Sequence, residues 1–328
     1  MNTSTVKRIL PLILSLMLML SLASCGSSTE KKVVIYSNAD EEAKVAMAET
    51  LDAKGYKDKY ILQSFGTSEL GGKIQGEGTN IEADLVTISS YYLDAAQKEK
   101  SMFTPLDFDY TPLDEKKDFY APLLAFEGSI IVNTKVLAEN NLPLPTTLKD
   151  LSTPQYKGMI SMVDLMGSST GWLMVQAILS EYGDVQGKEV LSGIYNNAGA
   201  HLEPSGSGPI KKIRAGEVAI GFGLRHQAVA DKAKGLPLDY IDPMEGNFSL
   251  QEGIAVVNKG DKTNPLAMEM AKCLVENVRP AIQRNYPVAL YQGETVAPEQ
   301  QSTYPKQFGA DLTIELLKAH QQFSESCK

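Results

Sequence analysis

The 328-residue sequence contains only three cysteines and three histidines. Three cysteines are too few for the disulfide framework of a small secreted domain, and their spacing relative to His201, His226 and His320 matches no zinc pattern. Positive charge is also scarce, because the sequence has 31 Lys and Arg residues against 40 Asp and Glu residues, which gives a formal charge of −9. The sequence therefore lacks the basic surplus that binding to phosphate backbones requires, and we expect no nucleic-acid partner.

Catalytic motifs are missing as well. Residues 66–70 lack the second glycine of a nucleophile elbow, and residues 203–208 lack the first. Residues 71–74 resemble the end of a P-loop, but Ile74 stands where Ser or Thr is needed. We therefore expect neither an enzyme nor a bound cofactor or metal.

A short apolar run begins near the N-terminus. Lys7 and Arg8 precede an almost wholly apolar stretch over residues 9–22, which has the length of a secretory signal sequence and is short for a membrane span. Leu22-Ala23-Ser24-Cys25 resembles the lipobox of bacterial lipoproteins. We expect residues 1–24 to be a lipoprotein signal peptide and residues 25–32 to be the lipidated Cys25 and a flexible tether. The alternative is a buried or membrane helix that ends at a cysteine by chance.

If Cys25 carries a lipid, two cysteines remain. Outside the cytosol, Cys273 and Cys327 could form a disulfide that ties the C-terminal tail to the fold. They could equally stay as two free thiols, and the sequence leaves both alternatives open.

Strand-like and helix-like segments alternate after residue 32. The predicted strands cover residues 32–36, 60–65, 83–88, 129–132, 159–162, 218–222, 238–241 and 254–257. The clearest predicted helices cover residues 91–99, 170–181, 188–196 and 265–276. This alternation is typical of an α/β fold with mixed, mostly parallel sheets covered by helices on both faces. The length indicates about two domains.

Small polar residues follow many of the predicted strands. Ligands of such sheets bind beyond the carboxyl ends of the strands, where helix N-termini present free N–H groups. Hydroxyl, amide and glycine residues let an anion approach these groups closely. A single such cluster is more typical of a helix N-cap, but the clusters together predict a binding site. The candidate ligand-binding residues are Asn38, Thr67, Ser68, Ser89, Ser90, Ser168, Ser169, Thr170, Ser205, Gly206, Ser207, Arg225 and His226.

Several stretches resemble the extracellular solute-binding proteins of ABC transporters. They are the lipobox, the Ser-rich tether, Asn133 after a Ser-Ile-Ile-Val strand, residues 204–209 and residues 216–221. Within these proteins the chain is most similar to the branch that contains the ferric-ion, thiamine and 2-aminoethylphosphonate binding proteins.

The resemblance implies a two-lobed periplasmic-binding-protein-like fold of type II, with two mixed, mostly parallel sheets flanked by helices, a hinge and a central cleft. Lobe one would comprise residues 33–127 plus about 253–284, and lobe two would comprise residues 128–252 plus about 285–328. The protein would be a monomer that is lipid-anchored at the cell membrane, facing outside the cytoplasm. It would deliver a small solute to a membrane permease with a cytoplasmic ATPase.

The residues after the 218–222 strand bear on the ligand. Ferric-binding members of the branch carry adjacent tyrosines there, because phenolate is a hard ligand for ferric iron. This chain has Arg225 and His226 instead, and an arginine repels a ferric ion but can hold phosphonate or phosphate oxygens bidentately. We therefore expect a small anionic solute, with an organophosphonate such as 2-aminoethylphosphonate as the first candidate. The alternatives are a ferric ion, thiamine or a sugar phosphate.

Three further assignments stay open at this stage. His226 either donates to the anion, which would make binding pH-sensitive, or is hydrogen-bonded at a helix start. Tyr91 and Tyr92, the one adjacent tyrosine pair, are more typical of core packing than of a ferric site. An amino group on the ligand would need a carboxylate or an aromatic face. The candidates for this partner are Glu245, Asp242, Glu127, Tyr91 and Trp172.

Overall fold

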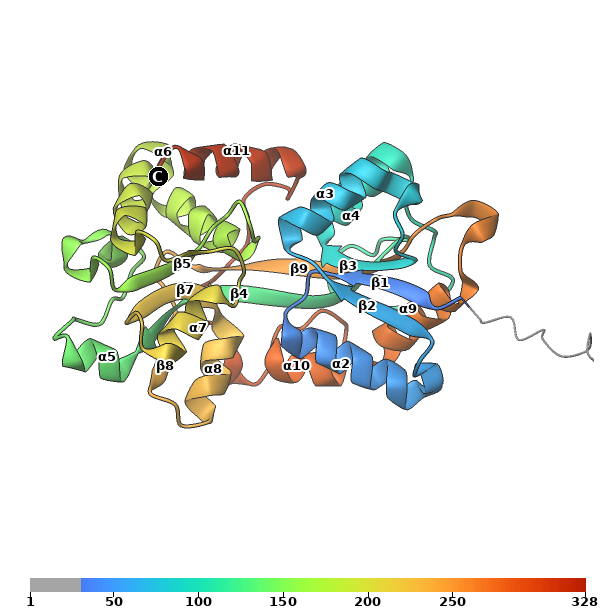
Figure 1. Cartoon of the computed structure of the whole chain (residues 1–328), viewed down its shortest axis with the longest axis horizontal. Helices are drawn as coiled ribbons and strands as arrows, with labels where there is room; N and C mark the ends of the chain where they lie inside the picture. Colours follow the sequence, from blue (N-terminus) through green and yellow to red (C-terminus); the bar gives the residue numbers. More distant parts are fainter. Residues whose placement is uncertain (1–30) are drawn as a thin grey trace, which may run out of the picture. The chain divides into compact units, whose positions relative to one another are not determined.

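The computed structural model describes residues 31–328 and is built around one mixed sheet of ten strands (Figure 1). The predicted signal peptide and Cys25 lie outside the described residues. The strand order is β2-β1-β3-β9-β4-β7-β5-β6, with β10 paired to β9 and β8 paired to β4. The strands are β1 (Val33–Ser37), β2 (Tyr60–Ser64), β3 (Leu85–Ser89), β4 (Ala121–Asn133), β5 (Ile160–Val163), β6 (Leu202–Glu203), β7 (Ile220–Leu224), β8 (Leu238–Ile241), β9 (Asn247–Val256) and β10 (Pro305–Lys306).

The outer parts of the sheet are parallel. β1 runs parallel to β2 and β3, which form the first sheet half, and β5 runs parallel to β6 and β7, which with β8 form the second sheet half. All residues of β1, β3, β5 and β7 are buried. Continuous apolar strands of this kind are typical of parallel sheets covered by helices on both faces.

Two long antiparallel strands join the sheet halves. β4 has 13 residues, which is about 43 Å of extended chain; it pairs with β9 up to Glu127 and with β7 from Gly128 onward. At this exchange a Cβ atom on Gly128 would lie 2.3 Å from Cζ of Phe222, so the strands can approach only because residue 128 is glycine. β4 and β9 therefore run through both halves and join them into one sheet, and the predicted mixed α/β architecture is confirmed. The predicted lobe boundaries stay a prediction, since residues 33–328 form one compact unit.

Helices cover both faces of the sheet, as predicted. Figure 1 shows α3, α4, α6 and α11 on one face and α2, α7, α8 and α10 on the other. The predicted helices over residues 170–181 and 188–196 are one helix, α6, which bends at Gly183 (φ 65°). The helices are α2 (Glu41–Leu51), α3 (Thr67–Glu77), α4 (Ser90–Lys100), α5 (Thr134–Glu139), α6 (Thr170–Ala198), α7 (Gly208–Ala215), α8 (Arg225–Ala233), α9 (Pro265–Asn277), α10 (Arg279–Asn285) and α11 (Ile314–Glu325). Among the described residues, none of these helices combines the length and apolarity that a membrane span needs.

Large aromatic side chains build the core beneath α6. Trp172 is fully buried, its ring lies 5.2 Å from that of Tyr91, and its indole N–H donates to Nδ1 of His320 on α11 at 2.7 Å. Tyr91 and Tyr92 are therefore core residues. Trp172 is likewise too deep to offer a face to a ligand.

The two remaining cysteines are both free. Cys273 on α9 and Cys327 just beyond α11 are buried and unpaired. Of the two alternatives left by the sequence, the structure therefore has the free thiols.

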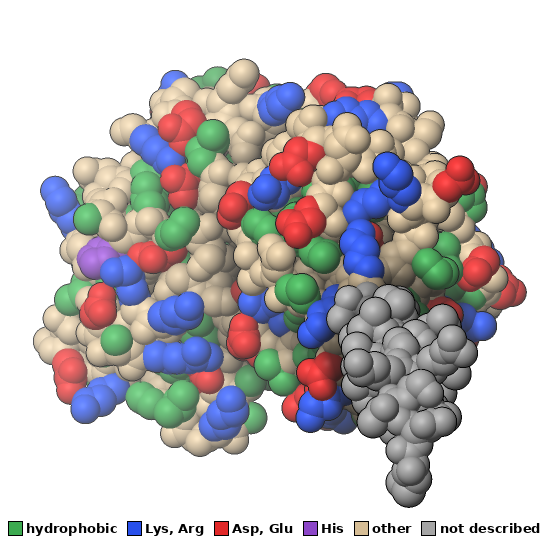
Figure 2. All heavy atoms as spheres, turned by 45° about the vertical axis from the view of Figure 1, so that its right-hand side comes forward, with side chains coloured by type: hydrophobic (Ala, Val, Ile, Leu, Met, Phe, Trp, Pro, Cys, Tyr) green, Lys and Arg blue, Asp and Glu red, His purple; other side chains and the backbone are tan. Residues whose placement is uncertain are grey.

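The surface carries charges of both signs. On the face shown in Figure 2, the Lys and Arg side chains are interspersed with Asp and Glu side chains. Proteins that bind a nucleic-acid backbone instead gather Lys and Arg side chains on one face.

Candidate ligand-binding cleft

A cavity of about 520 Å³ lies between the two sheet halves. This volume is within the range of small-molecule sites. The first half contributes the loops that follow β1 and β2, and the second half contributes the loops before α6 and α7. Phe126 of β4, Glu252 of β9 and Gln227 of α8 complete the wall.

Four helices begin at this cavity, and one of them, α2, contributes the acidic residues Asp40, Glu41 and Glu42 to the wall. The first residues of α3 and α6 and the loop directly before α7 also line it. The first N–H groups of a helix have no partner within the helix, but those of Thr170, Gly171 and Trp172 in α6 already donate to Ser168 and Ser169. Gly206 allows two of these starts to meet, because a Cβ atom on it would lie 2.5 Å from Oγ1 of Thr170. The predicted residues that the structure brings together here are Asn38, Thr67, Ser168, Ser169, Thr170, Ser205, Gly206 and Ser207.

Hydrogen bonds join the two sides of the cavity. The Ser207 hydroxyl donates to Oδ1 of Asp40 at 2.6 Å and accepts from Nε2 of Gln227 at 2.9 Å. Nε2 of Gln227 also lies 3.3 Å from a carboxylate oxygen of Glu42. Asp40 and Glu42 belong to the start of α2, whereas Ser207 and Gln227 belong to the second half, so these contacts hold the halves together around the cavity.

The cavity wall is acidic on balance. Its acidic residues are Asp40, Glu41, Glu42, Glu69 and Glu252, and its basic residues are Lys44, Lys211 and Arg214. Lys44 is paired with Glu41 at 3.0 Å and Arg214 is paired with Asp231, which reduces their reach toward a ligand. Burial raises the pKa of Asp40 to about 6. Burial also raises the pKa of Glu252 to about 8, and the charge of Asp40 adds to the rise.

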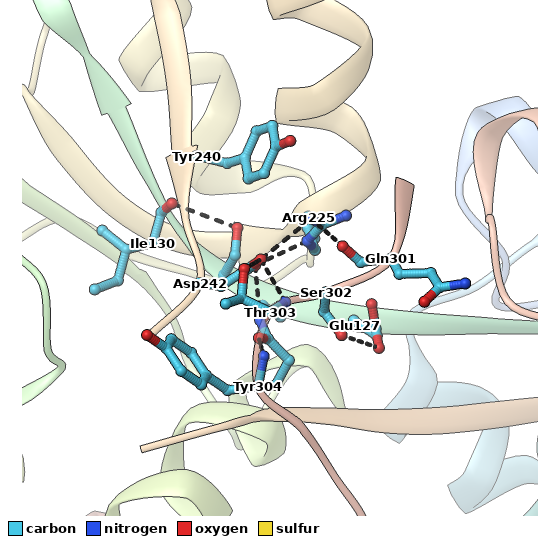
Figure 3. Close-up of polar contacts among 12 residues, drawn as sticks. Glu127, Ile130, Arg225, Tyr240, Asp242, Gln301, Ser302, Thr303 and Tyr304 are labelled. Atoms are coloured by element: carbon cyan, nitrogen blue, oxygen red, sulfur yellow. Dashed lines mark hydrogen bonds and ion pairs between the residues drawn. The ribbon is translucent and has the colours of Figure 1, made fainter. Parts of the chain in front are cut away.

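Arg225 does not line this cavity, so the prediction that its guanidinium binds the anion is wrong. Its guanidinium donates to both carboxylate oxygens of Asp242, at 2.8 and 3.2 Å, and to the carbonyl oxygens of Gln300 and Gln301 (Figure 3). The side chain is buried, and a buried guanidinium is stable only with such partners. Although burial acts to raise the pKa of Asp242, the hydrogen bonds from Arg225 and Thr303 hold it below its ordinary value. Arg225 therefore anchors the 300–303 segment to the end of β8.

Five other predicted residues also lie outside the cavity wall: Ser68, Ser89, Ser90, His226 and Glu245. Ser89 is fully buried within β3. Ser90, one residue on, lines a separate groove of about 1140 Å³ with Glu127 and Phe308.

Glu245 stabilises a turn instead of holding a ligand. Its carboxylate accepts from the backbone N–H groups of Leu148 and Lys149 and from the hydroxyl of Tyr182, at 2.7–3.1 Å. Both oxygens are thus occupied, and the side chain is buried. The prediction that Glu245 faces the ligand is wrong for this reason.

Both interpretations of His226 are wrong as well. Its ring is buried against Tyr286, with 4.1 Å between the ring centroids, and neither ring nitrogen has a hydrogen-bond partner. Burial lowers the pKa of His226 to about 3. The imidazole is therefore neutral at physiological pH and acts as a core side chain.

The residues of the wall that escaped the sequence analysis include Asp40, Phe126, Gln227 and Glu252. Asp40 and Gln227 each lie within two residues of a predicted site residue, so their neighbours in the sequence could have indicated them. Phe126 and Glu252 belong to the long strands β4 and β9, and only strand pairing brings them to the cavity. No local pattern marks them.

Comparisons with known proteins agree with this architecture. A family model described as bacterial extracellular solute-binding protein matches residues 83–307. An uncharacterized protein of Haemophilus influenzae is 24% identical over 253 residues, which are 72% of this chain and 71% of the relative. The spermidine/putrescine-binding periplasmic protein of Escherichia coli is 25% identical over 190 residues, about half of either chain (53%).

Solved structures match nearly the whole described unit. A periplasmic thiamin binding protein superposes with a TM-score of 0.74 at 16% identity, covering 92% of this chain and 98% of that one. Iron-bound HitA from Pseudomonas aeruginosa superposes with a TM-score of 0.70 at 19% identity, covering 90% and 99%. At these identities the likeness shows the fold.

Proposed function

Because the chain belongs to the family of bacterial extracellular solute-binding proteins, we propose that it is the substrate-binding lipoprotein of an ABC-type importer. It captures a small solute in the cavity between the sheet halves and delivers it to a membrane permease driven by a cytoplasmic ATPase. The lipid on Cys25 holds the protein, as a monomer, at the outer face of the cell membrane. The protein catalyses no reaction on the solute.

The proposed solute carries an anionic group, and an organophosphonate such as 2-aminoethylphosphonate is the first candidate. One observation carries this proposal: three helix starts with hydroxyl-bearing residues meet at one cavity. Helix N-termini and neutral donors of this kind favour phosphoryl oxygens. Because Arg225 does not line the cavity, neutral donors and Lys211 would bind the anionic group in place of the guanidinium.

A ferric ion is a weaker candidate. No tyrosine or histidine stands among the described residues that line the cavity, so the phenolate ligands on which a ferric site depends are not supplied there. Within residues 31–328, no group of three His, Cys, Asp or Glu side chains is placed to hold a metal ion. The binding screen described next distinguishes thiamine and sugar phosphates from organophosphonates.

The test is a thermal-shift and calorimetric screen of the full chain in detergent. The panel contains organophosphonates, inorganic phosphate, sugar phosphates, thiamine, polyamines and ferric citrate. A ligand at about 100 times its Kd stabilises the folded state by about 2.7 kcal/mol, so a saturable shift with an organophosphonate is the expected result. A shift with ferric citrate alone would contradict the proposal.

A further inference from the structure

Three buried oxygen atoms of the cavity wall accept no hydrogen bond. They are Oδ1 of Asn38, Oε1 of Gln227 and Oε2 of Glu252, and all three residues line the cavity. Gln227 and Glu252 are each only 3% exposed. Buried polar atoms in native proteins nearly always have a partner, so three unpaired acceptors in one cavity point to a missing donor.

The surrounding hydrogen bonds determine which atoms are left over. Nδ2 of Asn38 donates to Oγ1 of Thr67 at 3.0 Å and to Oε1 of Glu252 at 2.9 Å. Nε2 of Gln227 donates to Ser207 and faces the Glu42 carboxylate. Turning the Gln227 amide over would place its carbonyl oxygen against the Glu42 carboxylate, which is repulsive, and turning the Asn38 amide over would do the same against Glu252 once Glu252 is ionised. The unpaired atoms of both amides are therefore oxygens.

We propose that these three oxygens form a subsite for an ammonium group, and that the solute is a small primary amine that carries its anionic group at the other end. The inference rests on the proposed function, because it adds a cationic group to the solute proposed there. An ammonium has three N–H donors and no acceptor, which suits the two amide oxygens together with the ionised carboxylate of Glu252. The carboxylate of Glu252 supplies the matching charge. Glu252 thereby replaces Glu245 as the partner of the amino group.

The electrostatics of the empty cavity support this assignment. The titratable groups that act on Glu252 are Asp40, Tyr91 and Tyr286, and none of them is cationic. With burial as the main cause, the pKa of Glu252 is raised to about 8. The empty protein therefore holds a proton on Glu252 near neutral pH, and an arriving ammonium displaces it.

The test compares matched ligands that differ only in the amine. The pairs are 2-aminoethylphosphonate with ethylphosphonate, and putrescine with 1,4-butanediol, titrated calorimetrically into the full chain in detergent. We expect the amine of a pair to bind about 100-fold tighter, since it makes a desolvated charge pair. Glu252→Gln should reduce this preference to below about 10-fold without weakening the amine-free partner. Glu49→Gln, at an exposed position on α2, is the control and should leave the preference unchanged.

Each outcome separates the subsite from the phosphonate proposal. Equal binding of 2-aminoethylphosphonate and ethylphosphonate, or an amine preference that survives Glu252→Gln, overturns the subsite and leaves the phosphonate. Putrescine binding that depends on Glu252, with no binding of either phosphonate, supports the subsite and overturns the phosphonate. Binding of no amine at all overturns the subsite. If Glu252→Gln fails to fold, Gln227→Met decides by the same criterion, because it removes another acceptor at similar volume.

Discussion

Replacing Glu252 by glutamine should make the ligand-free protein more stable at alkaline pH. The pKa of Glu252 is raised from 4.5 to about 8 by burial, with Asp40 adding to the shift. The folded state therefore holds the proton more tightly than the unfolded chain does. The stability that this protonated carboxyl contributes is complete below about pH 4.5 and is lost progressively as the pH rises to about 8.

The size of the effect follows from the shift. A difference of about 3.5 pKa units at about 1.4 kcal/mol per unit gives roughly 5 kcal/mol. Glutamine keeps an oxygen that accepts from Asn38 and cannot ionise, so the variant does not suffer this loss. We expect the two proteins to have nearly equal unfolding free energies at about pH 4.5, and the variant to be more stable by roughly 4–5 kcal/mol at about pH 8.5.

The assay is urea denaturation of the ligand-free full chain across this pH range. Glu245→Gln is the matched control, because both oxygens of that buried glutamate already accept hydrogen bonds. It should destabilise the protein by about 1–3 kcal/mol, because it breaks these hydrogen bonds. Parallel pH curves for the wild type and Glu252→Gln would refute the reasoning, since they would mean that Glu252 titrates alike in the folded and unfolded states.

Three more predictions concern the cavity and its surroundings. Gly206→Ala should weaken solute binding by about 10-fold or more, because the added Cβ atom would collide with Thr170. Gly72→Ala is the control and should leave binding unchanged, because an added Cβ atom there would have no other atom within 4 Å. Titration calorimetry measures both affinities. Arg225→Ala should lower the unfolding free energy by about 3–5 kcal/mol in urea denaturation, because it leaves the buried carboxylate of Asp242 unpaired. The folded variant should keep its solute affinity. A loss of affinity without a loss of stability would instead show that Arg225 belongs to the site. Affinity for an amine solute should rise between about pH 6 and about pH 8 as Glu252 loses its proton, and Glu252→Gln should flatten this profile; equal slopes in the two proteins would contradict it.

The amino-acid sequence alone determined the parts that depend on neighbouring residues. Apolar runs such as 218–222 and capped segments such as 265–276 predicted strands and helices close to those observed, because local periodicity reports which face is buried. The hydroxyl and glycine residues before α6 and α7 predicted helix starts, and the parallel strands β5 and β6 that precede them carry these starts to one edge of the sheet. For this reason the 168–170 and 205–207 clusters were correctly placed together.

Only the tertiary structure decided which charged groups face the solute. Arg225 looked like the anion ligand from its place after a strand, but Asp242 at the end of β8 pairs with its guanidinium, and a buried cation needs such a carboxylate. Glu252 lay unmarked in a strand until the pairing of β9 with β3 and β4 brought it to the cavity. Burial and charge pairing depend on residues far apart in the chain, so the polarity of the cleft could be known only after the fold.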